Sequence, residues 1–94
     1  MRSRYTAYVN CDADYLQETW HPKTRPSIIE FEPKQKWLGL RIKDVEEGAV
    51  ESAVEFVARF KLDGRGHRLH ERSRFVFDRD RWYYLDGQIQ NSTR

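Results

Sequence analysis

The chain has 94 residues, of which 34% are charged and 14% aromatic, and its 17 Lys and Arg against 15 Asp and Glu give a net charge of +2. This length fits one domain with a single core, so we expect one domain over residues 1–94. The balanced charge disfavours nucleic acid as a partner, and the lack of a signal peptide or of an apolar run near the roughly 18 residues of a membrane span indicates a cytoplasmic protein with no membrane partner.

The first predicted helix covers residues 2–9, RSRYTAYV. Tyr5, Tyr8 and Val9 have the i, i+3, i+4 spacing of one helix face. Arg2 and Arg4 fall on the other faces of this helix. The spacing therefore predicts a short helix that contacts the core through its two tyrosines and Val9.

The second predicted helix follows over residues 12–21. Asp12 is a suitable N-cap, Leu16 and Trp20 have the spacing of an apolar stripe, and Pro22 stops the helix. The next segment, up to residue 37, holds all three prolines of the chain. We expect a connection there, with at most one short turn or strand.

From residue 37 the apolar residues follow the two-residue period of β-strands. Three strands are predicted in this part of the chain, over residues 37–45, 50–62 and 67–77. In the first of them Leu38, Leu40 and Ile42 alternate with small or charged residues, which predicts one buried face. The second and third strands are joined by a predicted loop at 63–66, DGRG, whose glycines tolerate the positive φ of a hairpin.

The length of this loop sets the predicted pairing of the two long strands. With four residues in the loop, Val54 lies opposite Phe75 and Phe56 opposite Ser73. The turn DRDR then returns the chain as a further strand, WYYLDG. The predicted pairs of this strand are Trp82 with Phe77, Tyr84 with Phe75, and Asp86 with Ser73.

The element order predicts an α+β fold, in which N-terminal helices pack on one face of a strongly curved antiparallel sheet. Alternation along the strands gives this sheet an outer polar face and an inner apolar face. The outer face carries Arg68, His70, Arg72 and Arg74. The inner face carries Leu69, Glu71, Ser73, Phe75, Phe77, Trp82, Tyr84 and Asp86. Ordinary amphipathicity does not explain two carboxylates and a hydroxyl on the inner face.

Six blocks of the sequence carry a family resemblance, namely MRSRYTAYV, DADYLQETWHP, WLGLRI, VEFVARF, LHERSRFV and RWYYLDG. In this order and at these separations they closely resemble the central domain of the YchJ family of bacterial proteins. The resemblance implies a cystatin-like, nuclear-transport-factor-two-like fold, in which helices and a bent sheet form a cone with a cavity. The zinc-binding SEC-C motifs of that family have no counterpart in this chain with its single cysteine, so neither a zinc function nor an established activity is carried over.

The inner face supplies the candidate site. We predict a pocket lined by Trp20, Phe56, Glu71, Ser73, Phe75, Trp82, Tyr84 and Asp86. Two carboxylates in an apolar cavity repel each other, which could raise the pKa of Glu71 or Asp86 toward neutrality. Three interpretations stay open: structural pairing of Glu71 with Arg2 or Arg4, recognition of a ligand, and general-base catalysis.

We therefore predict a non-catalytic module whose partner is a small ligand or a protein. One alternative is a small enzyme of the isomerase, cyclase or hydrolase type that uses Glu71 or Asp86 as a general base, an analogy that rests on fold alone. Another alternative is a scaffold that presents SEC-C zinc motifs. No metal or cofactor is expected, because His21, His67 and His70 are scattered and a lone Cys11, expected to be half-buried, cannot build a zinc site.

The outer face is a second candidate surface. Its cations are Arg59, Lys61, Arg68, Arg72 and Arg74. Glu51 and Glu55 lie on the same face and aromatic residues are missing from it, which favours a solvated lattice of ion pairs over a nucleic-acid site. Val57 and Val76 form a small apolar centre, through which a homodimer is an alternative use of this face.

Overall fold

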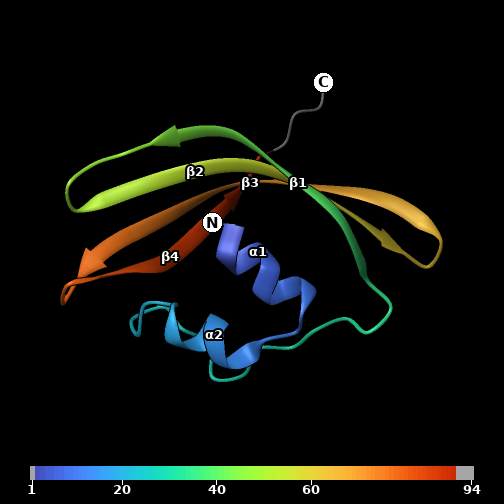
Figure 1. Cartoon of the computed structure of the whole chain (residues 1–94), viewed down its shortest axis with the longest axis horizontal. Helices are drawn as coiled ribbons and strands as arrows, with labels where there is room; N and C mark the ends of the chain where they lie inside the picture. Colours follow the sequence, from blue (N-terminus) through green and yellow to red (C-terminus); the bar gives the residue numbers. More distant parts are fainter. Residues whose placement is uncertain (1, 91–94) are drawn as a thin grey trace.

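The computed structural model describes residues 2–90. Its sheet is an antiparallel meander that arches over two short helices (Figure 1). Its elements are α1 (Arg2–Val9), α2 (Ala13–Glu18), β1 (Lys36–Glu46), β2 (Glu51–Leu62), β3 (Arg65–Asp78) and β4 (Arg81–Ile89). The four strands follow one another in the order β1-β2-β3-β4. The helices lie under the concave inner face, so the predicted α+β arrangement on a curved sheet is confirmed. Within the described residues no helix is long and apolar enough to cross a membrane.

Helix α1 has its predicted bounds but turns a different face inward, and α2 ends at Glu18, before the predicted end at His21. Arg4 and Ala7 are buried, whereas Val9 is 47% exposed, so the prediction that Val9 faces the core and Arg4 does not was wrong. The i, i+4 pair Arg4 and Tyr8 shares the inward side with Tyr5. The predicted cap of α2 is confirmed, because the Asp12 carboxylate accepts a hydrogen bond from the Tyr15 backbone at 3.1 Å.

Cys11 lies in the tight connection between the two helices. It is exposed, not half-buried as expected, and its φ of 55° is left-handed. The Asp12 backbone N–H donates to the Ala7 carbonyl at 2.8 Å, which closes the end of α1 across this residue. The Cys11 side chain is thus exposed to solvent at this connection.

The hairpin between β2 and β3 is tighter than the sequence suggested. Its turn is Asp63–Gly64, with φ values of 53° and 78°, and β3 begins at Arg65. Phe56 therefore lies opposite Glu71, and Val54 opposite Ser73. The predicted four-residue loop and pairing were wrong by two residues, but a shift of two keeps every side chain on its predicted face because strands alternate with period two.

A β-bulge in β4 changes the position of Asp86. Trp82 opposite Phe77 and Tyr84 opposite Phe75 confirm the predicted pairs. The register then slips, so that Asp86 lies opposite Arg74 and Gly87 opposite Ser73. Leu85 is the extra residue on the bulged strand. The predicted pair of Asp86 with Ser73 was wrong, and Asp86 lies on the outer face.

Strand β1 also contains irregularities, between Trp37 and Gly39 and between Ile42 and Asp44. The first of them leaves Leu38 52% exposed, so only Leu40 and Ile42 of the predicted stripe face inward. It also places Trp37 opposite Phe60, with the two rings 5.3 Å apart. Trp37 thereby reaches the tyrosines of α1 and closes one side of the inner face.

Candidate functional site

A cavity of about 200 Å³ lies between α1 and the inner face of the sheet. Its walls are formed by Arg4, Tyr5, Tyr8, Trp37, Leu40, Phe56, Ala58, Leu69, Glu71, Ser73 and Tyr84. Most of this lining is aromatic or aliphatic. The charged groups are few and converge from α1 and β3, which is the composition expected of a small-molecule site.

The carboxylate of Glu71 is the acidic group of this cavity. Its Oε2 accepts hydrogen bonds from the Ser73 hydroxyl at 2.7 Å and from the Tyr84 hydroxyl at 3.4 Å. The carboxylate lies against β4 at Gly87, where a Cβ atom would clash with it. Ser73 is fully buried, so Glu71 satisfies a hydroxyl that water cannot reach.

Arg4 is the basic group of the cavity, and it is 4% exposed. Its Nη1 donates to the Thr19 hydroxyl at 2.7 Å and to the Leu16 carbonyl at 3.5 Å. The guanidinium lies over the Tyr84 ring, 4.3 Å from its centroid, and 5.2 Å from the Trp20 ring. Burial lowers the pKa of Arg4.

Two features of Arg4 differ from a structural ion pair. The expected pairing with Glu71 is not among the ion pairs of the described residues. The second terminal nitrogen, Nη2, is buried and has no hydrogen-bond partner in the described part of the chain. An unpaired buried donor of this kind is costly, and a ligand acceptor would satisfy it.

Tyr84 links the two charged groups. Burial, followed by the negative charge of Glu71, raises the pKa of its phenol above the usual value. The hydroxyl therefore stays protonated at all physiological pH values and can donate to Glu71. Its ring meanwhile contacts Arg4 and packs edge-on against Trp20, with centroids 4.9 Å apart.

Four of the eight predicted pocket residues line this cavity, namely Phe56, Glu71, Ser73 and Tyr84. Trp20 supports it from behind through its contact with Tyr84. Sequence reasoning missed Tyr8 and Trp37 as lining residues and treated Arg4 only as a partner for Glu71. The i, i+4 spacing of Arg4 and Tyr8 was the available signal, because it places both on one helix face.

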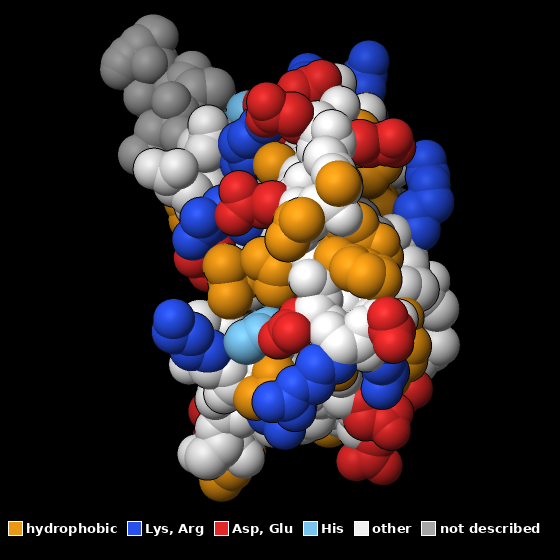
Figure 2. Space-filling model, turned by 90° about the vertical axis from the view of Figure 1, so that its left-hand side faces the viewer, with side chains coloured by type: hydrophobic (Ala, Val, Ile, Leu, Met, Phe, Trp, Pro, Cys, Tyr) orange, Lys and Arg blue, Asp and Glu red, His pale blue; other side chains and the backbone are white. Residues whose placement is uncertain are grey.

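Phe75 and Trp82 lie outside the cavity, toward the open end of the inner face. They line a separate hollow of about 390 Å³ with Val54 and Ser52. Figure 2 views the molecule from this end and shows hydrophobic side chains grouped among charged ones. The exposed large hydrophobic residues of this region include Val50, Phe77 and Trp82, at 64%, 40% and 44%.

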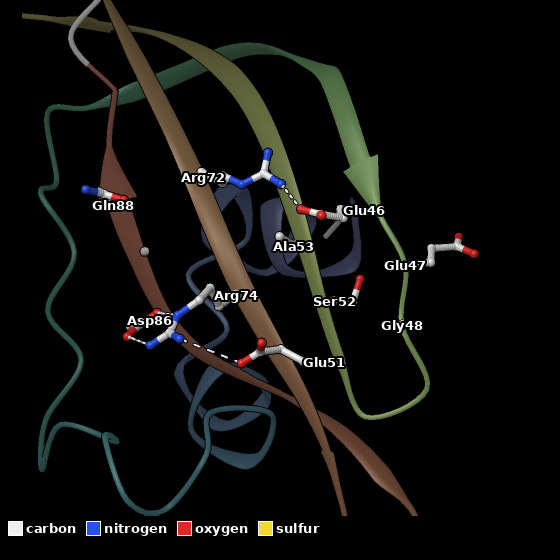
Figure 3. A pocket seen from close by; sticks show the side chains of 11 residues that line it. Glu46, Glu47, Gly48, Glu51, Ser52, Ala53, Arg72, Arg74, Asp86 and Gln88 are labelled. Carbon is white, nitrogen blue, oxygen red and sulfur yellow. Dashed lines mark hydrogen bonds and ion pairs between the residues drawn. The ribbon is translucent and has the colours of Figure 1, made fainter.

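Asp86 belongs to a charged hollow of about 670 Å³ on the outer face (Figure 3). Arg74 donates from Nε and Nη2 to its two carboxylate oxygens at 2.8 and 2.7 Å. This hydrogen-bonded pairing lowers the pKa of Asp86 and raises the pKa of Arg74. Asp86 is thus not a second carboxylate beside Glu71, and the predicted pair of carboxylates in one apolar cavity was wrong.

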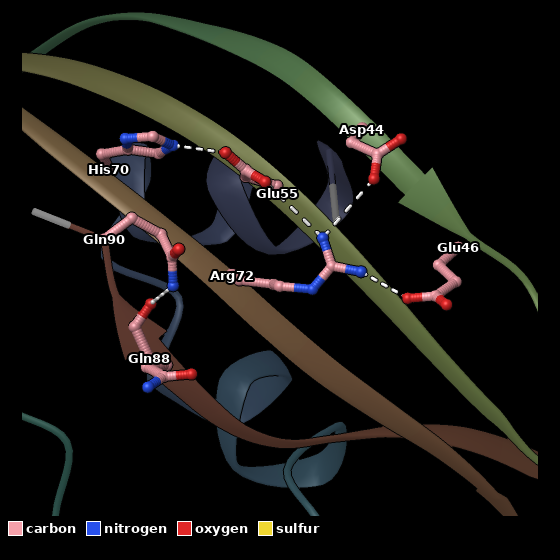
Figure 4. Close-up of polar contacts among 7 residues, drawn as sticks. All are labelled: Asp44, Glu46, Glu55, His70, Arg72, Gln88 and Gln90. Atoms are coloured by element: carbon pink, nitrogen blue, oxygen red, sulfur yellow. Dashed lines mark hydrogen bonds and ion pairs between the residues drawn. The ribbon is translucent and has the colours of Figure 1, made fainter. Parts of the chain in front are cut away.

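The rest of this half of the outer face is a lattice of ion pairs (Figure 4). Arg72 contacts Glu46 at 2.5 Å, Asp44 at 3.5 Å and Glu55 at 3.6 Å. His70 and Glu55 approach to 2.7 Å. The predicted solvated ion-pair lattice is confirmed for this half of the face.

The apolar centre expected on the outer face is small. Val57 is 6% exposed and Val76 is half-buried. A homodimer through this face stays a prediction. In the described residues no group of three or more His, Cys, Asp or Glu side chains could hold a metal ion.

Comparison with known sequences gives consistent matches over nearly the whole chain. A family model described as "YchJ, middle NTF2-like domain" matches residues 1–87. A UPF0225 protein of Methylibium petroleiphilum is 55% identical over 91 residues, which cover 95% of this chain and 67% of that protein. A UPF0225 protein of Bordetella pertussis is 54% identical over 94 residues, which cover 96% of this chain and 69% of that protein. The chain therefore spans about two thirds of the length of these relatives.

Two solved structures have a similar fold. A SEC-C motif containing protein from Rhodopseudomonas palustris matches with a TM-score of 0.84 and 36% identity, over 97% of this chain and 76% of that one. A SEC-C motif containing protein from Psychrobacter arcticus matches with a TM-score of 0.74 and 26% identity, over 100% of this chain and 60% of that one. Both are longer than the chain described above.

Proposed function

The chain belongs to the YchJ family as its middle NTF2-like domain, and from this premise we propose that it binds a small, ring-sized molecule in the cavity between α1 and the sheet. The observation that carries the proposal is the buried guanidinium of Arg4, which borders the cavity and has an unpartnered Nη2. The ligand we propose has a flat apolar body. Its polar end is neutral, and it accepts a hydrogen bond from Arg4 and donates one to Glu71.

The size of the cavity supports a ligand of this class. A dry apolar cavity of roughly 150 Å³ holds one benzene ring, and the space beside α1 is about 200 Å³. This is below the roughly 300–1,000 Å³ that is usual for drug-sized ligands. The volume therefore favours a single aromatic ring with a short polar substituent.

The charges around the cavity favour a neutral polar end. A carboxylate would satisfy Arg4 but would meet the negative charge of Glu71, and an ammonium group would do the reverse. An amide offers an acceptor and a donor together, so it suits both groups. The aromatic walls supplied by Tyr8 and Trp37 complement a flat ring.

The test is a titration of the protein with benzamide, followed in ¹⁵N–¹H correlation spectra. We expect saturable shifts at residues around the cavity, and weaker binding of benzoate and benzylammonium. Ala58→Leu fills the cavity from β2 and is expected to abolish the shifts. The matched control is Ala53→Leu, which makes the same change on the same strand but in the outer hollow.

Two results would contradict the proposal. One is that benzamide produces no saturable shifts in the wild-type protein. The other is that the Ala58→Leu variant, with an unchanged fold by its spectrum, binds as tightly as the Ala53→Leu control. Equal binding of all three compounds would remove the role assigned to the polar pair Arg4 and Glu71.

General-base catalysis now depends on Glu71 alone. A raised pKa from mutual repulsion requires two carboxylates in one cavity, and Asp86 is on the outer face in contact with Arg74. Glu71 also accepts hydrogen bonds from the Ser73 and Tyr84 hydroxyls, so its Oε2 is already engaged within the protein. Ligand binding is therefore better supported than general-base catalysis.

A second candidate function is that of a scaffold for a SEC-C segment. The two structural neighbours are SEC-C motif containing proteins and are longer than this chain, and the open end of the inner face exposes Val50, Phe77 and Trp82. A zinc-loaded SEC-C peptide from the Rhodopseudomonas protein is expected to shift the tryptophan emission of the domain. No shift, or the same shift in a Trp82→Phe variant, would contradict this role.

A further inference from the structure

The outer face of the sheet is divided into two halves of opposite charge. The half near the β2–β3 hairpin carries five exposed cations, Lys36, Arg41, Arg59, Lys61 and Arg68. None of these five forms an ion pair within the part of the chain that the structure describes. We call these five residues the cation half.

The other half of the outer face is acidic and hollowed. It contains the hollow of about 670 Å³ between the end of β1 and β4 (Figure 3). Four carboxylates and two arginines line this hollow, namely Glu46, Glu47, Glu51, Asp86, Arg72 and Arg74. Both arginines are already paired with carboxylates, so the hollow has an excess of negative charge. Asp44 and Glu55 add to this excess beside Arg72 (Figure 4). We call these eight residues the acidic half.

The segregation of charge is not explained by the stability of one copy. The register places Arg59 opposite Arg68 and Lys61 opposite Lys36. Like charges directly opposite on neighbouring strands destabilise a sheet, whereas opposite charges stabilise it. Acids interspersed among the five cations would therefore stabilise the sheet, yet the acids lie at the other end of the same face.

A second copy of the chain carries the charge that complements both halves. If two outer faces meet about a two-fold axis perpendicular to the strands, the strands of the two copies run in opposite directions. The cation half of each copy then lies on the acidic half of the other. A two-fold axis along the strands would instead place cations on cations and acids on acids. Charge therefore allows only the first of these two arrangements.

The middle of the face does not oppose this arrangement. The axis would pass close to Val57 and Glu55 of β2, which lie opposite His70 and Arg72 of β3. Val57 is buried, and the Glu55 carboxylate contacts both His70 and Arg72. The charges near the axis are thus compensated within each copy, and the attraction comes from the two ends of the face.

We propose that two copies of this chain associate through their outer faces, with the cation half of each copy on the acidic half of the other. A polyanion or an acidic protein would engage the cation half alone and would be repelled by the acidic half. A second copy engages both halves at once, and the two-fold axis closes the assembly at a dimer. Because the apolar centre at Val57 and Val76 is small, the association depends on charge and is sensitive to salt.

The test is sedimentation velocity of the chain at low and at high salt. We expect a concentration-dependent dimer at about 0.01 M salt and a monomer at about 1 M salt, because the Debye length falls from roughly 30 Å to roughly 3 Å. Two double variants each reverse charges in one half, Lys61→Glu/Arg68→Glu in the cation half and Glu46→Lys/Glu51→Lys in the acidic half. Each variant is expected to weaken the association at low salt by at least about tenfold, since like charges then meet across the interface.

A mixture of the two variants tests the arrangement directly. A pair with one copy of each variant keeps an unaltered cation half against an unaltered acidic half, and it places the two reversed halves against each other. The mixture is therefore expected to associate more tightly than either variant alone. The matched control is Lys23→Glu/Lys34→Glu, which makes the same change of net charge in the connection between α2 and β1 and is expected to dimerise like the wild type.

Four outcomes would overturn the proposal. The first is a wild-type protein that stays monomeric at low salt, which would leave the face to a different partner. The second is a control that weakens the association as much as the two variants do. The third is a mixture that associates no more tightly than either variant, while all proteins remain folded by circular dichroism. The fourth is growth beyond a dimer, which would indicate an open chain of copies. The Ala58→Leu cavity variant is expected to dimerise like the wild type, so this result is independent of the proposed ligand cavity.

Discussion

Gly87 provides a sensitive test of the polar arrangement in the cavity. A Cβ atom at this position would occupy the place of the Glu71 carboxylate and approach the Tyr84 hydroxyl at 2.8 Å. Glu71 is a flexible side chain, so it can move away at little cost in strain. Ser73 cannot follow, because it is fully buried in the sheet. The Gly87→Ala variant is therefore expected to leave the Ser73 hydroxyl without an acceptor.

The size of the effect follows from this loss. A buried hydroxyl that loses its partner costs about 1–3 kcal/mol. Alanine recovers about 0.5–1 kcal/mol relative to glycine within a strand, because glycine loses more backbone entropy on folding. We expect a net decrease of about 1–2 kcal/mol in the free energy of unfolding. For a domain of this size, that corresponds to a Tm lower by about 5–10 °C.

The assay is urea unfolding followed by tryptophan fluorescence, with a matched control at Gly66. Gly66 is also a strand glycine, and a Cβ at that position has no heavy atom within 4 Å. Gly66→Ala is expected to be neutral or slightly stabilising. In a Ser73→Ala background, the cost of Gly87→Ala should fall close to that of the control, because no hydroxyl is left unsatisfied. Equal effects of Gly87→Ala and Gly66→Ala in the wild-type background would refute the reasoning.

Three further predictions concern single ionisable groups. Because Arg74 lowers the pKa of Asp86, the stabilisation from this pair is present above about pH 4 and is lost as the pH falls through the lowered pKa. The Tm of Asp86→Asn should therefore fall less between pH 5 and pH 2 than the Tm of the wild type. Parallel curves of Tm against pH for the two proteins would contradict this. Because burial raises the pKa of Tyr84, its contribution to stability is present below about pH 10 and is lost above it. For the same reason Tyr84 adds little to the absorbance change at 295 nm between pH 8 and pH 11, so Tyr84→Phe should leave that change unaltered. A decrease by the amount of one tyrosine would show that Tyr84 titrates normally. Cys11 is exposed, so its thiol should react with Ellman's reagent as fast in the native protein as in urea. Its φ of 55° favours glycine, so Cys11→Gly should raise the free energy of unfolding by about 0.5 kcal/mol. A protected thiol, or a lower Tm of the variant, would be the contrary result.

Sequence reasoning identified the α+β fold and the faces of the sheet for a simple reason. Both depend on local periodicity, which is 3.6 residues along a helix and two along a strand. Glu71, Ser73 and Tyr84 lie on the predicted face although the predicted β2–β3 register was wrong by two residues, since an even shift preserves alternation. Because an even shift leaves the alternation unchanged, the alternation could not distinguish the two pairings. The Asp63–Gly64 turn and a four-residue loop fit the same pattern of apolar and polar residues.

Two features of the site depend on the tertiary structure and do not follow from local periodicity: the bulge in β4 and the burial of Arg4. One extra residue in β4 moved Asp86 from the inner face to the outer face and removed a predicted pair of carboxylates. The helix spacing predicts Arg4 on a solvent face, yet the sheet covers Arg4, because its guanidinium packs on Tyr84 and Trp20 while it donates to Thr19.

The sequence by itself therefore determined which elements form and which side chains share a face, since these follow from the local chain. Bulges, the packing of α1 and the separation of paired from unpaired cations depend on contacts between residues far apart in the chain. Those contacts form only when the sheet curves around the helices, and they bring Arg4 and Glu71 to the same cavity.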